Sequence, residues 1–200
     1  MIKKKLPAIF GIDYGKNYSR NTVVIIQKNG SMSVNQSQKN MDADKMIIEL
    51  AETHKPAAIF LDAPLSLPGV YSSPGEFDDF FYRKCDRATQ AMSPMFLGGL
   101  TARSMRLART LNNMRIELFE SYPAGIAKKL ELKKLGYKQS VHNIPACLNV
   151  IEPFIQPAIE IQAFTTWHHV DALLTLVVAS RYYDNIHQAY GNPEEGLIYI

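Results

Sequence analysis

Cysteine is scarce in this sequence, with two residues, Cys85 and Cys147, among 200. Two cysteines are too few for a disulfide scaffold or a four-cysteine zinc site. Long hydrophobic runs are also missing, and no uninterrupted apolar stretch approaches the ~18 residues that a membrane span needs. The basic start of the chain is followed only by the short apolar stretch 8–12, which predicts no secretory signal. We therefore expect a cytoplasmic protein without membrane association.

Several catalytic signatures are absent as well. The sequence contains no GxSxG, no Walker A motif and no GxGxxG, which removes the best-marked classes of hydrolases, nucleotide hydrolases and dinucleotide-binding enzymes. It also shows no internal repeat, low-complexity tract or clear linker. With 46% hydrophobic and 20% charged residues, the chain resembles a globular protein that buries a full core. These features predict a single domain over residues 1–200.

The charge balance is close to even. Twenty-two Lys and Arg residues against 19 Asp and Glu residues leave a net charge of +3. This small excess is compatible with a nucleic-acid partner without requiring one.

The first half of the sequence alternates strand and helix signals. Two short apolar runs, 8–13 and 57–62, each end in an aspartate and predict buried strands. Between them lies the β-branched run 21–27, which predicts a strand. Asn29-Gly30 follows it and is a strong hairpin signal, so a second, antiparallel strand is expected. Residues 42–52 have apolar residues at helical spacing, and Asp42 is placed to cap this helix. This order predicts an α/β fold with a mixed sheet, in which the strand of Asp13 has the strand of Asp62 as its parallel neighbour.

The second half is more helical. Pro and Gly residues make 64–99 an expected insertion or cap over the strand ends, longer than a simple crossover needs. The remaining predictions, in chain order, are a helix at 101–114, a strand at 115–120, a helix at 124–135, a strongly apolar helix at 167–185 and a terminal strand at 197–200.

Four carboxylates occupy unusual places in this pattern. Asp13, Asp62 and Glu120 each end an apolar strand, and Asp171 lies within the apolar C-terminal helix. A carboxylate at the edge of a core is costly unless it is paired, hydrogen-bonded or bound to a metal. Converging carboxylates repel one another, and Mg²⁺ or Mn²⁺ would relieve this and supply phosphodiester chemistry. The alternative is that each carboxylate only caps a helix or bonds a turn, as Glu120 would just before Ser121.

Basic side chains accompany these carboxylates. His168 precedes Asp171 by three residues, so the two can share a helix face. It could orient a water molecule, bind metal or contact a phosphate, or it could simply pack beside Trp167. Arg83, Arg87 and Arg103 are candidate substrate-binding residues for phosphates. The alternative for them is an ion-pair network with acidic residues nearby in the sequence, Asp78, Asp79 and Asp86.

Six short motifs occur in an order that resembles a known family. They are residues 10–15 (FGIDYG), 61–68 (LDAPLSLP), 83–87 (RKCDR), 120–123 (ESYP), 168–172 (HHVDA) and 190–198 (YGNPEEGLI). The chain is similar over nearly its whole length to the DUF429 family of predicted RNase H-like nucleases. The resemblance implies a ribonuclease H-like mixed sheet with helices on both faces. It implies Asp13, Asp62 and Asp171 as metal ligands, with Glu120 as a less certain fourth residue of the site.

Three functions compete on this basis. The first is a divalent-metal-dependent nuclease, with catalytic residues among Asp13, Asp62, Asp171, Glu120 and His168. The second is an actin-like ATP-dependent phosphotransferase, whose superfamily shares a Gly-Ile-Asp-x-Gly start but normally needs two such domains. The third is a non-catalytic binding module on the same fold, which the modest net charge favours.

Overall fold

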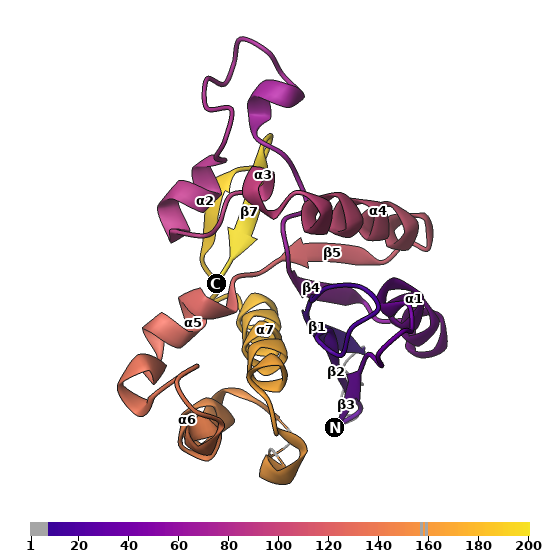
Figure 1. Cartoon of the computed structure of the whole chain (residues 1–200), viewed down its shortest axis with the longest axis vertical. Helices are drawn as coiled ribbons and strands as arrows, with labels where there is room; N and C mark the ends of the chain where they lie inside the picture. Colours follow the sequence, from indigo (N-terminus) through magenta and orange to yellow (C-terminus); the bar gives the residue numbers. More distant parts are fainter. Residues whose placement is uncertain (1–7, 157, 159) are drawn as a thin grey trace.

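A five-stranded mixed sheet forms the centre of the molecule (Figure 1). The computed structural model describes residues 8–156, 158 and 160–200. The strands are β1 (Ile9–Asp13), β2 (Val23–Lys28), β3 (Ser31–Gln36), β4 (Ala58–Asp62) and β5 (Glu117–Glu120). Their order in the sheet is β3-β2-β1-β4-β5, with β2 antiparallel to both neighbours and β1, β4 and β5 parallel. The predicted α/β class and mixed sheet are confirmed.

Helices cover both faces of this sheet. The α-helices are α1 (Ala43–His54), α2 (Lys84–Thr89), α3 (Pro94–Leu97), α4 (Gly99–Asn113), α5 (Pro123–Lys129), α6 (Ile144–Ile151) and α7 (Trp167–Tyr183). Figure 1 shows α5, α6 and α7 on one side of the sheet and α1 and α4 on the other. Among the residues that the structure describes, none of the helices is both long and apolar enough to cross a membrane.

The strands β1 and β4 contribute side chains to two hydrophobic cores, one on each face of the sheet. Alternate side chains of a strand point to opposite faces, so a strand that is buried on both faces is apolar throughout. Ile9 and Phe60 pack with α7, whereas Phe10 and Ile12 pack with α1 and α4. This double burial explains why the sequence marks β1 and β4 so clearly.

Local signals in the first half fold as predicted. Asn29 and Gly30 both have positive φ, 52° and 74°, as the tight turn between β2 and β3 requires. Asp42 caps α1, where its carboxylate accepts hydrogen bonds from the amides of Asp44 and Lys45 at 2.9 and 3.2 Å. Both elements are therefore determined by short-range chemistry.

The helix predicted over 124–135 is shorter in the structure. The α-helix ends at Lys129, and Glu131 adopts a left-handed conformation with φ of 54° that an α-helix does not tolerate. The chain then continues in single turns of 3₁₀ helix, which are η2 (Leu132–Leu135), η3 (Val141–Asn143), η4 (Glu152–Phe154) and η5 (Ile161–Ala163).

The segment 64–99 lies between β4 and α4. It carries the single turn η1 (Gly69–Tyr71) together with α2 and α3. The end of the chain forms a separate two-stranded sheet, β6 (Ala189–Asn192) with β7 (Gly196–Tyr199), beside α2 (Figure 1). Gly191 allows this contact, since a Cβ there would lie 2.7 Å from the Cβ of Cys85.

Candidate functional site

Asp13 and Asp62 lie side by side at one edge of the sheet. In the parallel pairing of β1 with β4 the two residues are direct partners, at the carboxyl end of each strand. Direct partners point to the same face, and that face is the one covered by α7. The predicted placement of these two side chains is confirmed. Ligands of open α/β sheets bind at this edge of the strands.

The helix α7 brings a third carboxylate to the same edge. Thr166 caps the helix by accepting a hydrogen bond from the amide of His169 at 3.4 Å. The helix then passes directly over β1 at Gly11, where a Cβ would lie only 2.6 Å from the carbonyl oxygen of Ala172. Glycine permits this close approach because it has no side chain. As a result Asp171, one residue before Ala172, is buried and close enough to Asp13 and Asp62 to raise the pKa of both.

The cluster of three carboxylates (Asp13, Asp62 and Asp171) is electrostatically strained. Burial raises the pKa of Asp13 despite a hydrogen bond from His168 that lowers it, and Asp171 raises it further. The pKa of Asp62 is raised well above its usual range, by burial first and then by repulsion from Asp13 and Asp171. Groups with this behaviour gather at functional sites, because such sites bring like charges together.

His168 provides a compensating hydrogen bond. Its Nδ1 lies 2.7 Å from Oδ2 of Asp13, while the side chain remains 42% exposed. The hydrogen bond to Asp13 raises the pKa of His168 and outweighs partial burial, which lowers it. The imidazole therefore lies between the carboxylate cluster and solvent. Its hydrogen bond with Asp13 is a contact that none of the alternatives drawn from the sequence included.

Lys138 and Tyr137 are site residues that the sequence analysis missed. Nζ of Lys138 lies 2.7 Å from Oδ2 of Asp171, and the hydroxyl of Tyr137 donates a hydrogen bond to the other carboxylate oxygen. Burial alone would lower the pKa of Lys138, but Asp171 and the neighbouring aspartates raise it. Both residues lie in the irregular segment after α5, where Lys138 has a positive φ of 61°. No periodic pattern marks such a position.

Glu120 does not join the cluster. It pairs in register with Leu61 rather than Asp62, so its side chain leaves the sheet on the opposite face. There it accepts hydrogen bonds from Nη1 and Nη2 of Arg83, at 2.7 and 2.6 Å, and from the amide of Leu65 at 2.9 Å. These three donors fully engage an ionised carboxylate. The structure thus gives Glu120 a buried ion pair with Arg83, which is neither a place in the cluster nor the expected bond to the turn that follows it.

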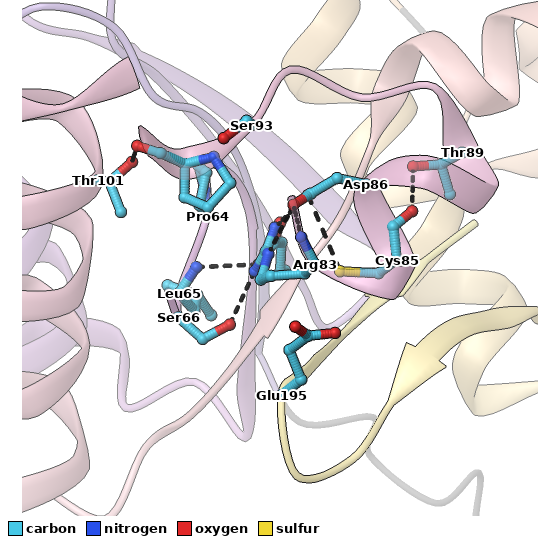
Figure 2. Close-up of polar contacts among 12 residues, drawn as sticks. Pro64, Leu65, Ser66, Arg83, Cys85, Asp86, Thr89, Ser93, Thr101 and Glu195 are labelled. Atoms are coloured by element: carbon cyan, nitrogen blue, oxygen red, sulfur yellow. Dashed lines mark hydrogen bonds and ion pairs between the residues drawn. The ribbon is translucent and has the colours of Figure 1, made fainter. Parts of the chain in front are cut away.

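Arg83 is the centre of a buried polar network. Its side chain is fully buried and also bonds Asp86 and the hydroxyl of Ser66. Figure 2 shows Arg83 between the loop that carries Leu65 and Ser66 and the start of α2. The guanidinium is saturated by protein groups, so the structure assigns it the ion-pair alternative.

The other two candidate arginines also form ion pairs. Arg87 contacts Asp79 at 2.8 Å and Arg103 contacts Asp44 at 2.7 Å. The partner of Arg87 is one of the acidic residues expected from the sequence, whereas Asp44 belongs to α1 and lies far away in the chain. Arg87 is 61% exposed, which leaves it the more accessible of the two.

Protein groups compensate the charge of the carboxylate cluster in this structure. Within residues 8–156, 158 and 160–200, no group of three or more His, Cys, Asp or Glu side chains is arranged so that it could hold a metal ion. The ammonium of Lys138 already places a positive charge on Asp171. The three carboxylates face one ammonium and one imidazole, and oxygen donors of this kind are those that Mg²⁺ prefers. Asp13, Asp62 and Asp171 are the residues that would hold such an ion.

A basic pocket opens beside the cluster. It has a volume of about 760 Å³ and includes Tyr137, which it shares with the carboxylate cluster. Three lysines line it, Lys128 at the end of α5 and Lys133 and Lys134 in η2. We call this feature the lysine pocket. Glu131 lines the same pocket and pairs with Lys134 at 2.6 Å, which leaves a small excess of positive charge in the pocket.

No family model matches the chain, and no curated protein matches it either.

Proposed function

We propose that this chain is a divalent-cation-dependent hydrolase of phosphodiester bonds in nucleic acid, built on a ribonuclease H-like fold. The observation that carries the proposal is the convergence of Asp13, Asp62 and Asp171 at the carboxyl edge of the sheet. Strained carboxylates of this kind reduce the stability of a fold at neutral pH, and a ligand that needs them explains their placement.

The topology supports the same proposal. In the order β3-β2-β1-β4-β5 only β2 runs against its neighbours, and α7 returns from the far end of the chain to pack on β1. This arrangement agrees with the sheet implied by the family resemblance of the six sequence motifs. In this topology two of the candidate ligands, Asp13 and Asp62, lie on the adjacent parallel strands β1 and β4, and Asp171 lies on α7.

The lysine pocket supports a polyanionic substrate. Lys128, Lys133 and Lys134 line a pocket together with Tyr137, whose hydroxyl donates a hydrogen bond to Asp171 of the carboxylate cluster. Lysines at such positions attract phosphates and make binding dependent on salt. A strand of nucleic acid lying over these lysines would bring a neighbouring phosphodiester to the acidic edge.

The residues of the site divide the work of hydrolysis among them. Asp13, Asp62 and Asp171 would hold a divalent cation, which when bound would neutralise charge on the phosphate and lower the pKa of water. Lys138 and Tyr137 fix the orientation of Asp171 through its two carboxylate oxygens. His168, partly exposed and bonded to Asp13, is placed to accept a proton at the free Nε2 and pass it to solvent.

A cleavage assay tests this function. Fluorescently labelled single-stranded and duplex DNA and RNA are incubated with the protein and Mg²⁺ or Mn²⁺, or with a chelator. We expect cleavage that needs the cation and that falls by at least about a hundredfold in Asp62→Asn. Asp79→Asn, which changes a carboxylate paired with Arg87 outside the cluster, is the matched control and should retain activity.

Cleavage that persists in the chelator, or in Asp62→Asn, would contradict the proposal. So would the absence of cleavage of all four substrates by a folded protein shown to bind Mn²⁺. In each case the control variant must behave as the unmodified protein does.

A further inference from the structure

A second, smaller pocket has Asp62 in its lining. Its volume is about 200 Å³, and it opens between the ends of β4 and β5 and the segment that carries α3 and α4. Residues that line it include Tyr14, Asp62, Met92, Leu100, Ser121 and Tyr122. We call it the Ser121 pocket. Its volume is below the range of about 300–1,000 Å³ that encloses a whole drug-sized ligand, so it suits a single ring system.

Ser121 is the feature that indicates a ligand. The residue follows β5 directly, and its amide donates a hydrogen bond to the carbonyl of Leu61 at 2.9 Å. Its side chain is buried, with 2% exposure, and Oγ has no hydrogen-bond partner among the described residues. A buried hydroxyl without a partner is costly, and nearly all such groups in native proteins are satisfied. A ligand in the pocket would satisfy this one.

The walls of the pocket select the kind of ligand. Ala91, Leu97, Leu100 and Ile198 supply apolar surface, and Tyr14 and Tyr122 supply aromatic rings. Two carboxylates, Asp62 and Glu120, also line it. Glu120 is paired with Arg83, but the negative charge of Asp62 disfavours a phosphate in this pocket, in contrast to the lysine pocket. A planar, uncharged ring with polar atoms at its edge fits both the apolar walls and the free hydroxyl.

We propose that the Ser121 pocket receives one nucleobase of the substrate, the base next to the phosphodiester that reaches Asp62. The inference rests on the proposed function and extends it to a base-binding subsite. Aromatic walls allow bases to stack, and the hydroxyl of Ser121 forms a hydrogen bond with the edge of the ring. The lysine pocket and the Ser121 pocket then take the two parts of a nucleotide chain, phosphates in the first and a base in the second.

Calorimetric titration with small fragments tests the subsite separately from catalysis. The ligands are the four nucleoside 5′-monophosphates and ribose 5-phosphate, which carries the same sugar phosphate without a base. We expect at least one monophosphate to bind about tenfold more tightly than ribose 5-phosphate. Equal affinities for all five compounds would overturn the proposal.

Two variants locate the binding. Ser121→Ala should lower affinity for the preferred monophosphate by about three- to tenfold, the effect of one hydrogen bond. Its melting temperature should stay the same or rise, since the hydroxyl has no partner to lose. Ala91→Phe, which fills the pocket, should remove the difference between monophosphate and ribose 5-phosphate. Ser33→Ala, at an exposed serine of β3, is the matched control.

The outcomes separate the two proposals. If Ser121→Ala is destabilised while its affinity for nucleotides is unchanged, the serine is structural and the subsite is refuted. Base-dependent binding that both pocket variants lose supports the subsite even when the cleavage assay fails. Cleavage of nucleic acid without base-dependent binding supports the function and refutes the subsite.

Discussion

Replacing Asp62 with asparagine should make the protein more stable at neutral pH. The substitution keeps the shape of the side chain and removes one of two carboxylates that the pairing of β1 with β4 sets side by side. The pKa of Asp62 is raised well above its usual range, by burial first and then by Asp13 and Asp171. The charged form of Asp62 therefore costs stability when no divalent cation is bound.

The size of this effect follows from the spacing of the strands. Two unit charges separated by about 4.8 Å repel by about 3.5 kcal/mol at an effective dielectric constant of about 20. Lys138 and His168 offset part of this energy, and Asp62 keeps some contact with water. We therefore expect a gain of about 1–2 kcal/mol, which for a chain of 200 residues is about 2–8 °C in Tm.

Differential scanning calorimetry in a chelator measures the gain. A raised folded-state pKa means that the folded protein binds more protons than the unfolded chain above the usual aspartate pKa. The contribution of the wild-type aspartate to stability thus falls as the pH rises from the usual pKa of an aspartate to the raised pKa of Asp62. The advantage of Asp62→Asn should be largest at neutral pH and should vanish as the pH is lowered and the folded carboxyl becomes protonated.

The matched control has the opposite sign. The pKa of Asp79 is lowered by its hydrogen bond with Arg87, so Asp79→Asn should leave Tm unchanged or lower it slightly. A fall in Tm for Asp62→Asn at neutral pH would refute the reasoning, because it would mean that the carboxylate stabilises the fold.

Three further substitutions test the structure around the site. His168→Gln should lower Tm below about pH 6.5, where the charged imidazole stabilises the protein through Asp13, and should matter little once the pH exceeds the raised pKa of His168; equal shifts at both pH values would contradict this. Arg83→Met leaves Glu120 buried and unpaired and should cost about 3–5 kcal/mol in urea unfolding, and a cost below about 1 kcal/mol would disprove the network's role. Gly11→Ala forces α7 away from β1 and should cost about 1–3 kcal/mol while weakening Mn²⁺ binding; unchanged binding would show that this close contact does not position the site.

The elements that position the site could be predicted because each is determined by local sequence. The continuous apolar runs of β1 and β4 reflect burial on two faces, and Asn29-Gly30 dictates a tight hairpin. With the hairpin and the crossover helix in place, Asp13 and Asp62 meet at one edge. The pairing of their side chains follows from topology alone.

The face to which Glu120 points could not be predicted. Ending a strand says nothing about register, and a shift of one residue moves a side chain to the other face of the sheet. Here β5 pairs so that Glu120 lies opposite Leu61, not Asp62. One residue of register therefore separates a member of the cluster from a partner of Arg83.

The contact of Lys138 with Asp171 was beyond sequence reasoning for another reason. Lys138 lies in a left-handed turn of an irregular segment and reaches a helix that begins much later in the chain. Such a pair depends on how α5, η2 and α7 pack together. Propensity and periodicity describe residues that are close in the sequence, so they cannot predict this contact between Lys138 and Asp171.

Calorimetric titration of Mn²⁺ into the wild-type protein and into Asp171→Asn, with melting curves of both, tests most directly whether the carboxylate cluster is a cation site. We predict that the wild-type protein binds Mn²⁺ and that the affinity rises with pH, because protonation of Asp13 and Asp62, whose pKa values are raised, competes with the ion. Asp171→Asn should remain folded and bind at least about tenfold more weakly. Equal Mn²⁺ affinity in the two folded proteins, or no binding to either, would contradict the account.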